Sequence, residues 1–544
     1  MKSERSILRF KPLSALALAI FGFSDAALAQ QMVTVGPYMA TLKTDAKRIV
    51  PKKPITFDFF AMDSKTMAVT ADATVTASLT MPSMSGMRLD PPKISKGGKP
   101  GHFNVEVALP HAGDYKLDVK LTTASGEITV LSFNLTAGAG KETVMGLMES
   151  GNLESMDMKA SLGGWQANRE GSGTAWQPDS SPMFMKMLPK VAGFELSAMG
   201  TVQSGYVQAG GQRGADHTFS NSMMMLMGQR ETGGGTLGLN FMTSLDPLFN
   251  GERGVPNLFQ TGETAYGVPL VDRQHPHNLY SEIAVSYSHP LSTNWSGFIY
   301  GGPVGEPTLG NVMFMHRPSG MEIPEAPISH HWFDSTHISF GVATIGLVYQ
   351  DKWKVEGSAF NGHEPGENRF AIEPIQLNSG AGRISFNPGK EWSLSGSYGY
   401  LSSPEALTPG VNEHRLTYSA AYSHAFTNGD SVSATAYLGQ NYVEGTPGVS
   451  NGMLAEATYY HAKDAFFTRF ERVDKDELFN VPAGNYTVNK LLFGDVHNIY
   501  SKHQIEYGLG AYAGLYGFPS SLNAYYGKNP VTLGIFFRIR PSKM

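Results

Sequence analysis

Half of the histidines in this chain lie in one stretch together with carboxylates. Eight of the 16 histidines fall between His275 and His363. Imidazole nitrogens and carboxylate oxygens suit copper, zinc or nickel, and about three or four such groups complete a site. Glu306 and Glu364 offer further oxygens in the same stretch. The histidine and aspartate candidates for metal ligands are His275, His277, His316, His330, His331, His337, His363, Asp272 and Asp334.

Methionine is also unevenly distributed. Twelve of the 26 methionines lie between Met145 and Met227, and one loop before them holds Met81, Met84 and Met87. Thioethers are soft ligands that suit Cu(I) and cannot form disulfides. We therefore add Met81, Met84 and Met87 to the candidate metal ligands. For the run from 223 to 227, packing is the stronger interpretation, because methionine fills irregular apolar gaps without any metal.

A structural network is the alternative interpretation of the histidine stretch. Arg273, Arg317 and Arg369 lie among the same carboxylates, and arginine–carboxylate pairs can hold a polar segment rigid. The two interpretations can hold together.

We expect no enzyme. Ser329, His330 and Asp334 are close in sequence, but closeness along the chain does not establish the geometry of a nucleophile and its base. The glycines at 233–235 are interpreted as a hairpin turn, because neither a helix nor a lysine follows them.

From about 193 to 540 the sequence alternates apolar and polar residues with period two. Leu533, Ile535 and Phe537, for example, alternate with Thr532 and Arg538. We count sixteen such strands, and their connections tend to alternate short and long. An even strand number with this loop pattern is typical of a bacterial outer-membrane barrel with both chain ends in the periplasm. Interfacial aromatic girdles are expected at Trp295, Tyr300, Trp353, Trp392, Tyr398, Tyr400, Tyr459 and Tyr460.

Composition and the first residues agree with an exported protein. The chain of 544 residues has no cysteine, 16% charged residues and a net charge of −5, which removes thiolate chemistry and gives no electrostatic footprint for nucleic acid. Residues 1–29 combine a basic start, an apolar run and a small-residue cleavage site, as a signal peptide does. We divide the remainder into a β-sandwich at 30–137, a methionine-rich linker at 138–192 and a barrel at 193–544.

The short alternating runs between 54 and 135 favour a small antiparallel sandwich. The segment MPSMSGM at 81–87 and the stretch at 100–121 resemble the YtkA-like domain, an immunoglobulin-like module of exported proteins, several of which are associated with copper handling.

The histidine stretch itself resembles an uncharacterised outer-membrane β-barrel family that is often found near heavy-metal resistance determinants. The resemblance covers most of 180–470. It is carried by Thr261–Ala265, Pro269–His277, Gly305–Pro307, Met315–Arg317, Ser329–Ile338 and Asn361–Arg369.

The sequence thus predicts an all-β protein, an antiparallel transmembrane barrel of about 16 strands preceded by a small periplasmic sandwich. We expect it to handle or transport a soft metal ion, copper or another divalent transition metal, without an organic cofactor. Its expected partners are outer-membrane lipid, the metal ion and a periplasmic protein, and no nucleic acid. The alternative is a non-conducting structural or receptor-like barrel whose periplasmic domain docks a partner.

Overall fold

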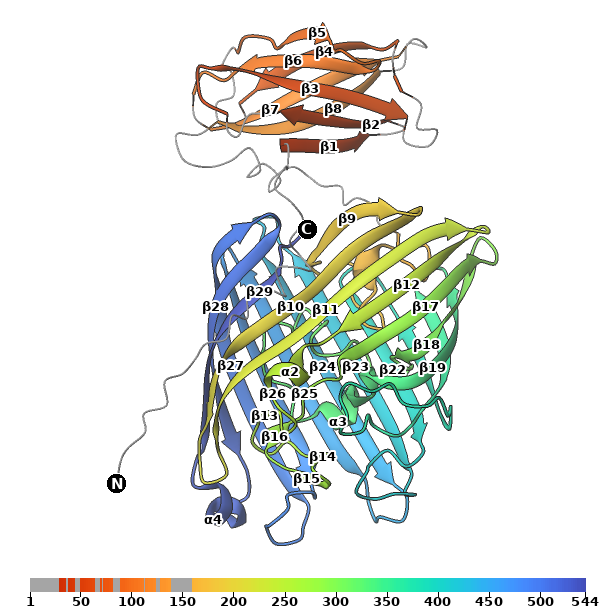
Figure 1. The fold of residues 1–544 in the computed structure, drawn as a ribbon, viewed down its shortest axis with the longest axis vertical. Helices are drawn as coiled ribbons and strands as arrows, with labels where there is room; N and C mark the ends of the chain where they lie inside the picture. The colour runs from red at the N-terminus through yellow and green to blue at the C-terminus, as the bar shows by residue number, and fades with distance from the viewer. Residues whose placement is uncertain are drawn as a thin grey trace, which may run out of the picture. The chain divides into compact units, whose positions relative to one another are not determined.

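The computed structural model describes residues 29–35, 38–44, 49–63, 69–70, 72–81, 89–111, 113–123, 128–137 and 159–544. The chain divides into two compact units, Met1–Met156 and Asp157–Met544, whose strands are labelled in Figure 1. The expected signal peptide lies outside the described residues apart from Ala29.

The first unit is a pair of antiparallel sheets. One sheet has the order β1-β2-β3-β6-β5, and the other has the order β4-β7-β8. Alternate residues of β3, β6 and β7 are buried, including Phe59, Val105 and Leu117, and they form the hydrophobic core of this unit. The predicted sandwich is confirmed. Its strands are β1 (Ala29–Val35), β2 (Tyr38–Thr44), β3 (Pro54–Asp63), β4 (Thr74–Thr80), β5 (Lys93–Lys96), β6 (His102–Ala108), β7 (Gly113–Thr122) and β8 (Ile128–Ala137).

The second unit is a closed antiparallel barrel. All sixteen predicted strands are present. They are β10 (Phe194–Ala209), β11 (Asp216–Thr232), β12 (Gly235–Thr243), β17 (Tyr280–Pro290), β18 (Trp295–Gly305), β19 (Ser339–Tyr349), β20 (Trp353–Phe360), β21 (Ser379–Phe386), β22 (Trp392–Leu401), β23 (Glu413–Ala425), β24 (Ser431–Val443), β25 (Ser450–His461), β26 (Asp464–Lys475), β27 (Tyr486–Lys502), β28 (Ile505–Gly517) and β29 (Val531–Pro541).

The barrel closes where its first strand meets its last. The second half of β10 pairs with β29, from Val202↔Ile539 to Ala209↔Thr532. The first half of β10 pairs instead with an additional strand, β9 (Met185–Val191). This strand was not among those predicted.

The two rims of the barrel differ in their connections. At one rim tight turns join the strands: Gln350 and Asp351, between β19 and β20, both have positive φ, as a type I′ hairpin turn requires. At the other rim lie the connections 244–279, 306–338 and 361–378. Pro541 pairs with Ile505 beside a tight turn, so the chain ends at the short-turn rim. Short turns face the periplasm in bacterial barrels.

The outward face of the wall is apolar. Ile345 is 65% exposed whereas its neighbour Thr344 is 5% exposed. In the last strand Ile535 is 64% exposed whereas Arg538 is 1% exposed. Apolar residues therefore face outward and polar ones inward, which is the alternation of a barrel surrounded by lipid.

Pairs of aromatic rings in contact lie at the short-turn rim. Ring centroids are 4.8 Å apart for Trp295 and Tyr349, and 4.0 Å apart for Trp353 and Phe386. Trp392 pairs with Tyr422 in the same way. These pairs form the interfacial girdle that the sequence predicts at the three tryptophans.

Two of the expected girdle residues face inward instead. Tyr300 is 3% exposed and donates a hydrogen bond to Glu282 at 2.6 Å. Tyr460 is 9% exposed and lies beside Phe184. The parity of the strand decides the direction, because neighbouring Ile299 and Tyr459 are the exposed residues.

Closure, an apolar outward face and the rim aromatics together identify the second unit as an outer-membrane barrel. Among the described residues, no helix has the length and apolar character needed to span a membrane.

The lumen is filled by three chain segments, 159–184, 244–279 and 306–338, which we call the plug. Figure 1 shows α2, α3 and β13–β16 inside the wall. Every residue from 304 to 342 is buried. The short elements of the plug are η2 (Ala167–Arg169), α2 (Asp246–Phe249), β13 (Val255–Pro256), β14 (Glu263–Ala265), β15 (Val268–Leu270), β16 (Arg273–Gln274), α3 (His330–Phe333) and η3 (Ser335–His337). The loop before β29 carries η4 (Ser520–Leu522) and α4 (Asn523–Tyr526).

Buried ion pairs join the plug to the wall. Glu322 of the plug lies against Arg538 and Arg540 of β29. Arg317 pairs with Glu456 of β25, where Nε and Oε1 are 2.5 Å apart. Because an unpaired buried charge is costly, these pairs hold the plug in one position.

Residues 159–184, which we expected to form part of a linker, belong to this plug. Trp176 is 1% exposed, and Thr174 donates a hydrogen bond to Glu356 of β20 at 2.6 Å. The segment shows no sequence period because protein surrounds it on all sides, so that no single face must be apolar.

Candidate metal centre

The clearest group of ligand atoms lies on the long-loop side of the plug. One atom from each of Glu263, His331 and Glu364 lies within 4.8 Å of the other two, and it is the one such set of histidine and acidic side chains found among the described residues. We call it the carboxylate–histidine site. Its residues come from β14, from α3 and from the connection after β20.

Further charged groups surround the site. Glu263 contacts His275 and pairs with Arg369, where Oε2 and Nη2 are 2.7 Å apart. Glu405 lies 3.8 Å from Nδ1 of His331. The site is therefore rich in carboxylates, and the side chains of Glu263, His331 and Glu364 are each 10–12% exposed.

The protons of two imidazoles are directed to backbone carbonyls. His275 donates from Nδ1 to the carbonyl of Pro276 at 2.9 Å, and His337 donates from Nδ1 to the carbonyl of Asp334 at 2.7 Å. Nε2 of His337 is buried and makes no hydrogen bond to any described residue, whereas Nε2 of His275 faces Glu263. A carbonyl bond at one ring nitrogen is the arrangement that fixes the tautomer of metal-binding histidines.

Burial and charge shift the pKa values around the site. Burial lowers the pKa of His275 to about 4, against the opposing effect of Glu263. Burial alone would lower the pKa of His331, but the carboxylates of Glu364 and Glu405 outweigh this effect and raise the pKa well above its usual value. Burial and the charge of Glu364 raise the pKa of Glu405. The crowding of carboxylates thus favours a positive charge at their centre.

A chain of imidazole rings leads inward from this site. Ring centroids are 5.8 Å apart for His331 and His330, 5.1 Å for His330 and His337, and 5.5 Å for His337 and His277. Asp334 accepts from Nδ1 of His330 at 2.8 Å and pairs with Arg317.

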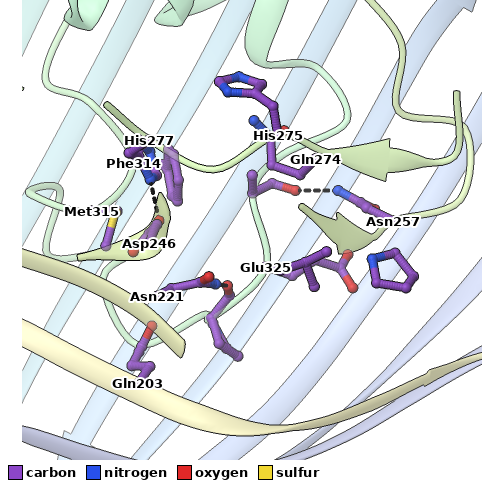
Figure 2. A pocket seen from close by; sticks show the side chains of 14 residues that line it. Gln203, Asn221, Asp246, Asn257, Gln274, His275, His277, Phe314, Met315 and Glu325 are labelled. Carbon is purple, nitrogen blue, oxygen red and sulfur yellow. Dashed lines mark hydrogen bonds and ion pairs between the residues drawn. The ribbon is translucent and has the colours of Figure 1, made fainter. Parts of the chain in front are cut away.

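The inner end of this chain lines a small cavity. Figure 2 shows His277 bonded to Asp246 on one side, with Met315 beside them and His275 and Glu325 across from them. The free space is about 20 Å³, which is room for one water molecule or ion.

His316 has a different environment. It is 4% exposed, and its Nε2 lies 3.3 Å from Sδ of Met242 in β12. Burial lowers its pKa to about 4. Methionines 223, 225, 242, 313 and 315 form one buried cluster there, with Phe314 and Ala326. We call these five residues the thioether cluster.

Seven of the predicted ligands lie in or next to the carboxylate–histidine site and the imidazole chain: His275, His277, His330, His331, His337, His363 and Asp334. His363 is turned toward the carbonyl of its neighbour Glu364. His316 lies apart, at the thioether cluster.

Asp272 and the methionines of the first unit are placed elsewhere. Asp272 pairs with Arg213 at 2.6 Å and accepts from the backbone of Phe259, so its carboxylate serves the packing of the plug. Met81 is buried in the core of the sandwich. Met84 and Met87 lie outside the described residues.

Two residues at these sites were not among the candidates. Glu263 lies in Thr261–Ala265, one of the segments that carry the family resemblance. That resemblance is the sequence signal that could have identified it. Met242 stands alone in β12, and no sequence pattern distinguishes it.

The structural alternative is also present in part. Arg317 and Arg369 pair with carboxylates, as that interpretation expects. Arg273 instead donates to the backbone carbonyls of Arg253 and Gly254.

From the sequence we expected no G-x-S-x-G nucleophile elbow, yet residues 448–452 have this spacing. Ser450 begins β25 of an antiparallel hairpin and accepts a hydrogen bond from Trp332 at 3.1 Å. A nucleophile elbow requires a strand followed by a helix, which this hairpin is not.

Comparison with solved structures gives weak similarity to outer-membrane channels. OmpF of Salmonella typhi, in complex with daunomycin, is 10% identical with a TM-score of 0.41, covering 65% of this chain and 100% of that one. An anion-selective porin from Comamonas acidovorans is 12% identical with a TM-score of 0.39, covering 64% and 99%. The channel DcaP of Acinetobacter baumannii is 10% identical with a TM-score of 0.38, covering 65% and 99%.

A comparison with curated proteins finds no match. The family model described as YtkA-like matches residues 33–120, which confirms the resemblance of the first unit, so the barrel is preceded in the chain by a YtkA-like domain.

Proposed function

We propose that this outer-membrane barrel binds a divalent transition-metal ion, with copper the first candidate, at the carboxylate–histidine site. The observation that carries the proposal is the meeting of Glu263, His331 and Glu364 within 4.8 Å. Two carboxylates and an imidazole form a mixed oxygen and nitrogen set that suits Cu(II) or Zn(II).

The contact between His275 and Glu263 supports this proposal. With its Nδ1 proton directed to the carbonyl of Pro276, His275 turns Nε2 toward Glu263, whose other carboxylate oxygen pairs with Arg369. Nε2 of His275 is therefore a further nitrogen donor beside the three ligand groups.

The position of the site supports capture from outside the cell. All three ligands come from connections at the long-loop rim, which faces the exterior in bacterial barrels. From there the rings of His331, His330, His337 and His277 follow one another at 5–6 Å, toward the cavity of Figure 2. Passage would proceed by ligand exchange along these imidazoles.

Binding is tested by titrating Zn(II) and Cu(II) into the full-length protein in detergent, with bound metal counted by elemental analysis. The variant carries Glu263→Gln and Glu364→Gln. Its control is Glu391→Gln, which removes a carboxylate paired with His424 at 2.6 Å near the opposite rim. We expect stoichiometric binding in the wild type and the control and its loss in the variant. Equal binding by all three would refute the proposal.

A non-conducting, receptor-like barrel is the second candidate, and the continuous burial of 304–342 favours it. The two candidates are separated by metal uptake into proteoliposomes that contain a metal-sensitive dye. Uptake that is lost in His337→Ala supports transport along the imidazoles. Binding without uptake supports the receptor.

A further inference from the structure

The thioether cluster contains methionines of both the barrel wall and the plug. Met223 and Met225 belong to β11, Met242 belongs to β12, and Met313 and Met315 belong to the plug. Met225 and Met242 are register partners on neighbouring strands. All five are at most 5% exposed.

His316 lies against this sulfur and lacks a hydrogen-bonding partner on its other side. Nε2 is 3.3 Å from Sδ of Met242, and Nδ1 is buried with no hydrogen bond among the described residues. A thioether is only a weak acceptor, so this contact satisfies the ring poorly. His277 and His330, by contrast, each have a carboxylate partner within 2.8 Å. His316 is thus a fully buried imidazole with a sulfur atom at one ring nitrogen and no partner at the other.

We propose that His316 and Met242, completed by other thioethers of the cluster, bind a soft monovalent ion, Cu(I) or Ag(I). One imidazole and two or three thioethers form a neutral donor set, which suits a monovalent ion in a buried place because no additional charge has to be compensated. The flexible methionine side chains can turn toward an ion without moving the backbone.

This site is separate from the carboxylate–histidine site in both residues and donor chemistry. It rests on the His316–Met242 contact and stands whether or not Glu263 and Glu364 bind a divalent ion. The barrel interior would then hold a hard-donor site and a soft-donor site, and would distinguish the two oxidation states of copper by ligand type.

Packing is the competing explanation, because five methionines can fill a gap without metal. Replacement of methionine by leucine separates the two explanations: the volume and apolar character are nearly kept whereas the sulfur is lost. A packing role predicts no change in ion binding. A ligand role predicts weaker binding in a folded protein.

The test titrates Ag(I), a redox-inert probe, into the full-length protein in detergent, and repeats the measurement with Cu(I) against a chromogenic chelator. The variants are Met242→Leu and His316→Gln, alone and combined. The control is Met321→Leu, another buried methionine of the plug that lies outside the cluster. Heat-modified mobility on gels reports whether each barrel is folded.

We expect each single variant to weaken the affected site by at least about tenfold and the combined variant to bind one equivalent fewer. The Met321→Leu protein should bind as the wild type does. The Glu263→Gln and Glu364→Gln variant should keep Ag(I) and lose Zn(II), and the combined variant should do the reverse. Unchanged Ag(I) and Cu(I) binding in the folded combined variant would overturn the soft-ion site and leave the divalent proposal untouched. If that variant does not fold, the same comparison is made with Met242→Leu alone.

Discussion

Gly262 lies directly against the imidazole of His331. A Cβ atom built on Gly262 would stand 2.3 Å from Cε1 of that ring, closer than any real contact. The φ of Gly262 is +109°, a backbone conformation that side chains rarely adopt. The glycine therefore lets the loop around β14 approach α3, and it brings Glu263 within reach of His331.

The first prediction follows from this contact. Replacement Gly262→Ala should displace His331 and weaken divalent metal binding by about tenfold or more, because the ligands no longer converge. The measurement is the Zn(II) titration of the detergent-solubilised protein. The matched control is Gly267→Ala, which also has a positive φ but no atom within 4 Å of the added Cβ. Equal losses in both variants would mean that backbone strain, and not the contact with His331, sets the affinity.

The barrel strands were predictable because their signal is local. Alternation such as Thr344–Ile345 reports which side of one strand meets lipid, and tight turns such as Gln350–Asp351 bound it. The plug was not predictable by the same means. Trp176 and Arg317 are buried in a segment with no period, because their partners, Lys354 and Glu456, lie on strands far along the chain.

The candidate site was predictable in part, because a local excess of histidine is visible in the sequence. Seven of the candidates from this stretch do lie in or next to the carboxylate–histidine site and the imidazole chain. The sequence does not indicate which residues these candidates contact. Glu263 meets His331 only because the 244–279 and 306–338 segments fold side by side in the lumen. Met242 is likewise joined to His316 by tertiary packing alone.

A second prediction concerns the buried ion pairs that join the plug to the barrel wall. Replacement Glu322→Gln leaves Arg538 and Arg540 without their buried plug partner, which should destabilise the plug by about 3 kcal/mol or more. Faster hydrogen exchange of residues 304–342 and intermittent conductance in planar bilayers are the expected results. Glu506→Gln is the control, because Glu506 contacts the same arginines from β28 and not from the plug. Slow exchange and a closed channel in Glu322→Gln would show that these pairs do not hold the plug.

A third prediction tests whether 159–184 is part of the plug. Trp176 is 1% exposed, and it lies against Lys354 and Arg169. Its replacement by alanine should cost about 3–5 kcal/mol and release this segment, because the cavity left behind cannot collapse against a rigid wall. Limited proteolysis of the folded protein should then cut between 159 and 184. Trp353→Ala, on the outward face of the wall at the short-turn rim, should leave the segment protected, and protection in both variants would contradict the assignment.

The last prediction concerns pH. Burial raises the pKa of Glu306, which follows β18 in the plug, to about 8. The folded protein therefore holds a proton that the unfolded chain releases near the usual pKa of glutamate. Between these two values the folded state binds more protons, so stability falls as the pH rises, by about 1.4 kcal/mol for each unit. The contribution is complete below the usual pKa and is lost as the pH passes 8. In urea titrations followed by tryptophan fluorescence, the wild-type plug should open at lower urea at pH 8.5 than at pH 6. Glu306→Gln, an uncharged mimic of the protonated acid, should remove most of that difference. An equal pH dependence in both proteins would show that Glu306 is ionised in the folded barrel.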